Sequence, residues 1–216
     1  MGGAFITFEG IEGSGKSTQM ARLDDSLRAR GLDPLVTREP GGTAFGRTVR
    51  AVLLMPDEAA RARSPLTEAL LMVADRHEHV VQVIAPALAA GRVVLCDRHA
   101  DSTLAYQGGG SGVDRATLER LNAIAVLGTE PVLTLLFDLP VKDALGRMAA
   151  RADRANAAVD RFEAETVLFH ERVRRVYLEL AAAQPGRIAV IDAARPADQV
   201  FADVRGRVEE RLAAAS

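Results

Sequence analysis

Short apolar runs alternate along the chain with longer stretches in which apolar residues recur at helical spacing. We interpret the apolar runs as strands, at Phe5–Phe8, Pro34–Val36, Val93–Cys96, Val132–Phe137 and Ile188–Ile191. Helix-like stretches separate these runs. This alternation predicts an α/β fold in which helices cover both faces of a mostly parallel sheet.

Capping residues indicate where several helices begin and end. The helix predicted at Lys16–Arg30 ends before Gly31. The stretch Ala149–Val159 has no clear periodicity, and we interpret this stretch as a candidate mobile lid between two helices. Further helices are predicted from Ser64-Pro65 to about Ala90, from Asp114 to Val126 before Gly128, and from Asp160 and Glu163, which have capping-box spacing, towards Gln184.

The predicted helix that begins at Pro65 has two different faces. One face carries only apolar side chains: Leu70, Val73, Val80, Val81, Ile84 and Leu88. The other carries Met72, Asp75, Arg76 and His79, at i, i+3, i+4 and i+7. Methionine suits a half-buried face that lines a cleft, where Arg76 would donate hydrogen bonds to a ligand. The spacing alone is equally compatible with a solvated face.

Composition narrows the functional classes. The 216 residues, 48% of them apolar, fit one domain spanning residues 1–216. The net charge of −2 provides no positive field for nucleic acid or an anionic membrane, and every apolar run is too short to cross a bilayer. We expect no secretory signal, and the single cysteine, Cys96, excludes a disulfide framework. Both features suit the reducing cytoplasm.

The motif G-x-x-x-x-G-K-S at residues 10–17 is typical of a phosphate-binding loop. It lies between a strand and a helix, which directs backbone N–H groups and a helix N-terminus at a phosphate. The chain has only two lysines, Lys16 and Lys142, so composition does not explain the lysine here. We expect Lys16 to reach the β- and γ-phosphates of a nucleoside triphosphate and Ser17 to reach Mg²⁺. The residues expected to hold this nucleotide are Gly10, Ile11, Glu12, Gly13, Ser14, Gly15, Lys16, Ser17 and Thr18. A glycine-rich turn that merely connects strand and helix is the alternative.

Asp97 and Arg98 follow the buried strand Val93–Cys96. Ligands of open parallel sheets bind beyond the carboxyl ends of the strands. There Asp97 can hold Mg²⁺ through water, and Arg98 can bind a phosphate with two N–H groups. A strand-end ion pair without a catalytic role is the alternative.

Three polar side chains soon after Arg98 suit a base or a sugar. Thr103, Tyr106 and Gln107 share one predicted helical face and offer a hydroxyl, a ring and an amide. A polar helix surface is the alternative. Glu39 precedes a glycine-rich turn, where the backbone can approach a ligand closely or simply turn tightly.

Arginines gather in the candidate lid, at Arg147, Arg151 and Arg154. Basic side chains that close over phosphates stabilise the negative charge of the transition state of phosphoryl transfer. Because arginine is the usual basic residue of this chain, solvated lid charge is the alternative.

In combination these motifs resemble those of bacterial thymidylate kinases. They are GIEGSGKST from Gly10, TREPGGT from Thr37, MVADRHEHV from Met72, LCDRHADSTLAYQGGG from Leu95 and DRFE from Asp160. The similarity runs from about Phe5 to Asp192. It implies a P-loop nucleoside-monophosphate-kinase fold, with a parallel sheet of about five strands and a short lid at about residues 147–160. It also implies transfer of the γ-phosphate of ATP to dTMP, dependence on Mg²⁺, a homodimer and a cytoplasmic location.

The resemblance also implies roles for individual residues. Glu12 would lie near the deoxyribose and the metal, and Arg98 would hold the dTMP phosphate. The other predicted acceptor residues are Arg76 and Thr103 at the thymine edge, Tyr106 and Gln107 beside the sugar and base, and Glu39 and Ser102 in the same site.

Two positions depart from common family patterns. One branch of the family has a loop arginine where this chain has Gly13, so the chain is similar to the branch whose catalytic arginine lies in the lid, with Arg151 the first candidate and Arg154 the second. Relatives usually place phenylalanine against the thymine where this chain has Met72.

Two other functions remain open from the sequence. A P-loop kinase can phosphorylate another nucleoside monophosphate or a nucleoside. A nucleotide switch or ATPase module hydrolyses nucleotide without an acceptor, and it would have no use for Arg76, Thr103 and Tyr106 together.

Overall fold

The computed structural model describes residues 3–55, 63–155, 162 and 165–214, and only the backbone of residues 151–155. Five strands form one sheet in the order β2-β3-β1-β4-β5, and all neighbouring strands are parallel. The strands are β1 (Ala4–Glu9), β2 (Leu35–Arg38), β3 (Val93–Asp97), β4 (Leu133–Asp138) and β5 (Ile188–Asp192). All five predicted strands are confirmed.

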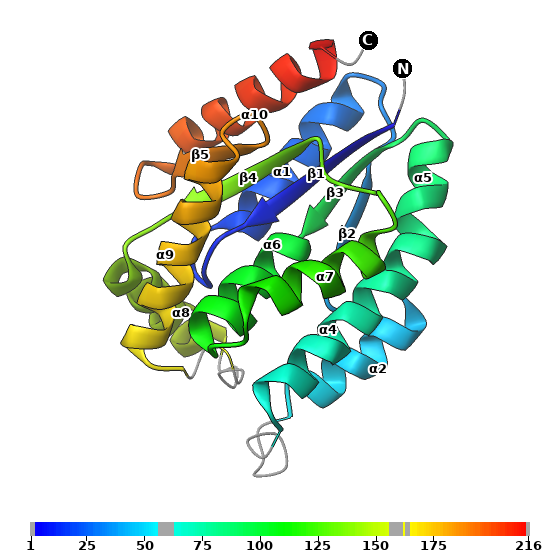
Figure 1. The fold of residues 1–216 in the computed structure, drawn as a ribbon. Coiled ribbons are helices and arrows are strands. Elements are labelled where there is room, and N and C mark those ends of the chain that lie inside the picture. The colour runs from blue at the N-terminus through cyan, green and yellow to red at the C-terminus, as the bar shows by residue number, and fades with distance from the viewer. Residues whose placement is uncertain (1–2, 56–62, 156–161, 163–164, 215–216) are drawn as a thin grey trace.

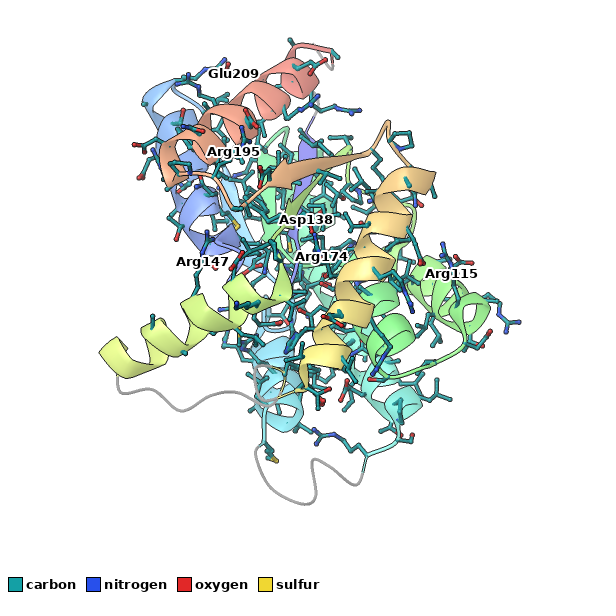
Figure 2. All side chains as sticks on the ribbon, turned by 90° about the vertical axis from the view of Figure 1, so that its left-hand side faces the viewer. Arg115, Asp138, Arg147, Arg174, Arg195 and Glu209 are labelled. Atoms are coloured by element: carbon teal, nitrogen blue, oxygen red, sulfur yellow. The ribbon has the colours of Figure 1, made fainter. Side chains whose placement is uncertain are left out.

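Helices cover both faces of the sheet (Figure 1). They are α1 (Lys16–Ala29), α2 (Ala44–Leu53), α4 (Pro65–His79), α5 (Ala85–Ala89), α6 (Ala100–Thr103), α7 (Arg115–Val126), α8 (Val141–Ala155), α9 (Val167–Ala183) and α10 (Ala197–Ala214), with π-helical stretches η1 (Val80–Ile84) and η2 (Leu104–Gly110). Figure 2 shows α1 and α10 on one side of the strands and α7 and α9 on the other.

The central strand shows why the sheet is covered on both faces. Every residue of β1 is buried; Ile6 and Phe8 belong to one apolar cluster and Phe5 to a second. Polar groups lie instead at the carboxyl ends, because each strand ends in a charged residue: Glu9, Arg38, Asp97, Asp138 and Asp192. The fold therefore collects charge at one edge of the sheet.

Two of the predicted helix starts are confirmed by their caps. Ser64 accepts a hydrogen bond from the N–H of Thr67 at 3.2 Å, and Asp114 accepts one from that of Thr117 at 2.8 Å. The prediction of a helix that begins at residue 160 is wrong. Residues 162, 165 and 166 are not helical, and the Thr166 side chain caps α9. The predicted capping pair, residues 160 and 163, lies outside the described residues.

The interpretation of residues 149–159 as an aperiodic lid needs correction in its first half. Helix α8 continues to Ala155. Alanine and arginine are strong helix formers, so their propensity can continue a helix where the sequence shows no apolar periodicity. Residues 156–160 lie outside the described part of the chain, and lid movement stays a prediction.

Candidate active site

A cavity of about 1170 Å³ lies beyond the carboxyl ends of the strands. Pockets for one small ligand occupy roughly 300–1,000 Å³, so the volume of this cavity lies above the range usual for a single small ligand. It brings together residues 12–18 of the loop and every predicted acceptor and metal residue: Glu39, Met72, Arg76, Asp97, Arg98, Ser102, Thr103, Tyr106 and Gln107. Gly10 and Ile11 lie behind the cavity wall rather than on it.

The glycines of the loop have conformations that other residues rarely adopt. Gly10 has φ 135° and Gly13 has φ 75°. A Cβ at Gly10 would lie 2.5 Å from the carbonyl oxygen of Phe137, and a Cβ at Gly13 would lie 2.5 Å from that of Ala144 in α8. The loop thus follows the end of β4 and the first turns of α8 too closely for side chains.

Lys16 is held at the loop by backbone acceptors. Its Nζ donates to the carbonyl oxygens of Gly10 and Ile11, at 2.9 Å each. Burial, and next the charge of Arg98, lower the pKa of Lys16 to about 8. The ammonium is therefore poorly solvated, and an anionic phosphate is a ligand that would stabilise its charge.

Arg98 directly follows β3, and several groups hold its guanidinium in place. Its Nη2 donates to Glu12 Oε1 at 2.7 Å and to the Tyr106 hydroxyl at 3.0 Å, and its guanidinium lies 4.8 Å from the Tyr106 ring centroid. Burial alone would raise the pKa of Glu12, but Arg98 and Lys16 outweigh it and lower that pKa. The Arg98 backbone is left-handed, with φ 71°, an unusual conformation that surrounding contacts must maintain.

The Glu39 side chain holds Arg76 in place. Its Oε2 accepts a hydrogen bond from Arg76 Nε, and its Oε1 accepts from His79 Nδ1 and His99 Nδ1, all at 2.9 Å. Burial would raise the pKa of Glu39, but His99 and Arg76 keep it well below its usual range. Although Glu39 was predicted as a substrate contact, both of its carboxylate oxygens are engaged by the protein.

Arg76 retains donors for a ligand. Besides Glu39 it binds Asn122 Oδ1 at 2.7 Å through Nη1 and the carbonyl oxygen of His99 at 3.0 Å through Nη2. A guanidinium has five N–H donors, and these contacts use three of them. The side chain is 2% exposed and borders the cavity.

The polar face of α4 is buried, so the solvated-face alternative is wrong. Asp75, Arg76 and His79 are at most 2% exposed, whereas Leu70 and Val81, which lie on the predicted apolar face, are nearly half exposed. The glycine-rich turn before α2 packs against this polar face: Asp75 accepts from the N–H of Gly41 at 3.0 Å, and a side chain at Gly42 would overlap the His79 ring. These glycines serve helix packing.

A π-helical turn explains why Val81 does not share the burial of Val80 and Ile84. After His79 the chain continues through η1, whose wider turn changes the face that each later residue occupies. Val80 and Ile84 stay buried while Val81 does not. A helical wheel at 100° per residue does not apply beyond such a turn.

The residues proposed for a base or sugar are also buried. Thr103, Tyr106 and Gln107 are at most 5% exposed, so the alternative of a polar helix surface is wrong. Gln107 Nε2 donates to Glu68 Oε1 at 2.9 Å, which fixes the orientation of the amide on the cavity wall. A carboxylate on α4 thus sets which end of the Gln107 amide is free.

Asp97 and Ser17 fit the predicted metal site. Asp97 Oδ1 is buried beside the cavity and has no hydrogen-bond partner among the described residues. Ser17 presents an exposed hydroxyl at the start of α1. A hard divalent cation such as Mg²⁺ prefers oxygen donors of this kind.

Sequence reasoning missed several residues of the site. Glu9 and Tyr177 contact the groups around Arg98, and the Phe162 ring meets the Tyr106 ring edge-on at 5.9 Å. Ala193 and Arg195 border the cavity directly after β5. The strand-end rule applied to Asp97 and Arg98 would have found the last two, whereas no local pattern marks Tyr177 or Phe162.

Comparisons with known proteins agree with this geometry. The thymidylate kinase family matches residues 8–204. The chain belongs to the thymidylate kinase family. It is 51% identical over 210 residues to the thymidylate kinase of Desulfovibrio desulfuricans, covering 96% of each chain, and 48% identical to that of Trichlorobacter lovleyi, covering 97% of this chain and 98% of the other.

A solved structure supports the fold of this thymidylate kinase family member. The crystal structure of thymidylate kinase from Ehrlichia chaffeensis superposes with a TM-score of 0.75 at 32% identity, covering 96% of this chain and 99% of the other. The predicted P-loop nucleoside-monophosphate-kinase fold is confirmed. The protein is a nucleotide kinase, so the switch or ATPase-module alternative is wrong. In the described part of the chain no helix combines the length and apolar character needed to span a membrane.

Proposed function

We propose that the chain transfers the γ-phosphate of ATP to dTMP, giving dTDP and ADP, in the cavity at the sheet edge. The observation that carries this assignment is the Arg98 guanidinium, which is fixed on the wall of a cavity that it shares with the Lys16 loop. One cation then serves the donor phosphates and the other the acceptor phosphate. Coupled assays with dTMP, dUMP, dCMP and AMP test the assignment, and the highest kcat/KM is expected for dTMP.

Positioning and charge neutralisation carry the reaction. A phosphate oxygen of dTMP forms a bond to the γ-phosphorus while the bond from that phosphorus to the β,γ-bridging oxygen breaks, and ADP leaves. The acceptor is already an oxyanion, so no strong general base is needed. Arg98 orients the acceptor, Lys16 neutralises the donor, and the cavity walls exclude water. When bound, Mg²⁺ would be held by Ser17 and through water by Asp97, and it would neutralise phosphate charge.

The thymine end of the site is proposed to lie at Met72, Arg76, Thr103 and Gln107. Met72 is half-buried, packs against the larger apolar cluster and borders the cavity. Arg76 and Gln107 are oriented by Glu39 and Glu68 respectively, so the Arg76 guanidinium and the Gln107 amide are fixed before a base binds.

Replacing Met72 with phenylalanine should tighten dTMP binding by up to about tenfold, the upper range of an added aromatic stacking contact. A thioether packs on a base but constrains its orientation less than a ring. The gain should extend to dUMP, because both bases present a π face. Affinity and melting temperature are measured on the same variant. Lower stability with unchanged or weaker dTMP affinity would show that the ring merely overpacks the helix.

We propose that Arg151, with Arg154 as the second candidate, supplies the catalytic arginine. Their side chains lie outside the described structure, and the support is their place at the end of α8, beyond a segment that borders the cavity. Each single alanine variant should lower kcat with dTMP affinity unchanged, because a lid arginine reaches the phosphates only on closure. A double variant with the wild-type rate would contradict this role.

Gly13 provides a control for the same prediction. A side chain there would strike the backbone of Ala144 in α8. Gly13→Arg should therefore not rescue an Arg151→Ala variant, although the substitution restores an arginine near the phosphates. Recovery of kcat in the double variant would show that α8 moves to accommodate the new side chain and that an arginine at either position can be catalytic.

We further propose a homodimer and a cytoplasmic location. Exposed apolar side chains lie on three neighbouring helices, α2, α4 and α7, at Phe45, Leu66, Leu70 and Ile124. Leu70→Glu should shift the protein from dimer to monomer in sedimentation velocity, because it places a charge on the central helix of this layer. An unchanged sedimentation coefficient would show that the dimer interface does not include Leu70.

A further inference from the structure

A buried carboxylate lies directly behind Arg98. Glu9 ends β1 and has no exposed surface. Its Oε1 accepts a hydrogen bond from the backbone N–H of His99 at 2.7 Å. Its Oε2 accepts from the Ser102 hydroxyl at 2.6 Å and from the Tyr177 hydroxyl at 2.7 Å. Three segments distant in sequence therefore meet at one carboxylate.

The same two hydroxyls face the Arg98 guanidinium. Arg98 Nη1 lies 3.3 Å from Ser102 Oγ and 3.3 Å from the Tyr177 hydroxyl oxygen. A hydroxyl has one hydrogen and two lone pairs, so a hydroxyl that donates to Glu9 presents lone pairs to Arg98. Donation to an anion also makes that oxygen a stronger acceptor. Ionised Glu9 thereby strengthens both contacts to the guanidinium.

Glu9 and Tyr177 are separated from the cavity by the residues that they hold. Neither borders it, whereas Arg98, Ser102 and Tyr106 do. The Tyr177 ring also packs edge-on against Tyr106, with centroids 6.3 Å apart. The contacts of Arg98 with Ser102, Tyr177, Glu12 and Tyr106 set the direction of its guanidinium.

We propose that Glu9 and Tyr177 are positioning residues of the acceptor site, which hold Arg98, together with Ser102, in the orientation that receives the dTMP phosphate. The inference rests on the proposed function, in which Arg98 binds that phosphate. It adds two residues, from β1 and α9, that never touch the substrate.

The charge of Glu9 provides a readout. Burial, and next the charge of Asp101, raise the pKa of Glu9 to about 7. The titratable and charged groups around it are Asp101 on α6, Arg98 after β3, Lys16 on α1, Cys96 on β3, Tyr177 on α9 and Arg187 before β5. Glu9 therefore gains its charge as the pH rises through neutrality, and the Arg98 contacts strengthen with it.

Tyr177→Phe and Glu9→Gln test the proposal, because both keep the packing shape. Each should raise the KM for dTMP by roughly tenfold, as expected for weakened hydrogen bonds to a charged group, and leave the KM for ATP within about twofold. Melting temperatures show that the variants are folded. If a folded variant keeps the wild-type KM for dTMP, or if both KM values rise alike, the positioning role is wrong.

A pH series separates positioning from structural support. The dTMP phosphate itself titrates near pH 6, equally in every variant, so the ratio of KM values between Glu9→Gln and wild type isolates Glu9. The ratio should rise as the pH increases through about 7. A ratio that does not change with pH would overturn the proposal.

Two further variants serve as controls. Asp101→Asn removes a neighbouring buried charge that does not contact either hydroxyl, so at pH 8.5 it should keep the wild-type KM for dTMP. A large rise in the KM of Asp101→Asn for dTMP would show that loss of any buried charge nearby has the same effect, and it would overturn the specific role of Glu9. Arg98→Ala tests the underlying function. If this variant binds dTMP normally, the assignment of Arg98 to the acceptor phosphate is wrong. If Arg98→Ala weakens dTMP binding but Glu9→Gln and Tyr177→Phe do not, only the positioning role is wrong.

Discussion

Replacing Lys16 with alanine should reduce kcat by roughly a hundred- to a thousand-fold while the protein stays folded. The ammonium is the only lysine charge at the loop and is held there by the carbonyl oxygens of Gly10 and Ile11. Without the ammonium, one cation fewer stabilises the negative charge that develops between the β- and γ-phosphates in the transition state. Single-turnover kinetics with saturating ATP and dTMP measure the loss.

Stability measurements on the same variant distinguish a catalytic from a structural lysine. Because the pKa of Lys16 is lowered to about 8, chiefly by burial, the charged form is less favourable in the folded protein than in the unfolded chain below that pH. Lys16→Ala or Lys16→Met should therefore have a melting temperature at pH 7 equal to or above the wild type. As the pH rises from about 8 to 10.5, the wild type should gain stability relative to the variant. Near-normal turnover in a folded variant would refute the P-loop assignment.

Replacing Arg98 with alanine should weaken dTMP binding by at least about thirtyfold and change ATP binding far less. Truncating one partner of a buried, hydrogen-bonded charge pair costs about 2–5 kcal/mol, and here it also leaves the Glu12 carboxylate facing the acceptor phosphate. Separate titrations of the two nucleotides by calorimetry measure the difference.

Two variants bracket this result. Arg98→Lys keeps the charge but loses the planar fork that reaches Glu12, Ser102 and Tyr106, so it should recover only part of the affinity. Arg115→Ala removes an arginine whose ion pair with Glu119 lies on the surface of α7 (Figure 2), and it should bind dTMP normally. Equal losses for both nucleotides in Arg98→Ala would make Arg98 a structural ion-pair residue.

Local features are what the sequence predicted well. The strands, the phosphate loop and the helix starts at Ser64 and Asp114 depend on neighbouring residues: apolar runs, glycines with positive φ, and side chains that cap the nearest N–H groups. The strand-end rule also placed Asp97 and Arg98 correctly, because parallel strands bring their carboxyl ends to one edge.

Partners distant in the chain limited the remaining predictions. The sequence shows that Asp75, Arg76 and His79 share a face, but only the packing of other elements against α4, among them the Gly41–Gly42 turn and α7, makes that face buried. The sequence placed Glu39 in the site, but only the fold brought Arg76, His79 and His99 to its carboxylate.

The sequence by itself determined the parallel α/β fold, the phosphate loop and the predicted acceptor residues of the cavity wall, because apolar runs, glycines and strand ends mark these features locally. The tertiary structure alone decided which charges pair. Glu9 and Tyr177 are 168 residues apart and meet behind Arg98 only because α9, which packs against η2 and β5, brings the Tyr177 hydroxyl to the end of β1. No local pattern marks that contact, since burial of a carboxylate becomes favourable only when hydrogen-bond donors from other elements converge on it.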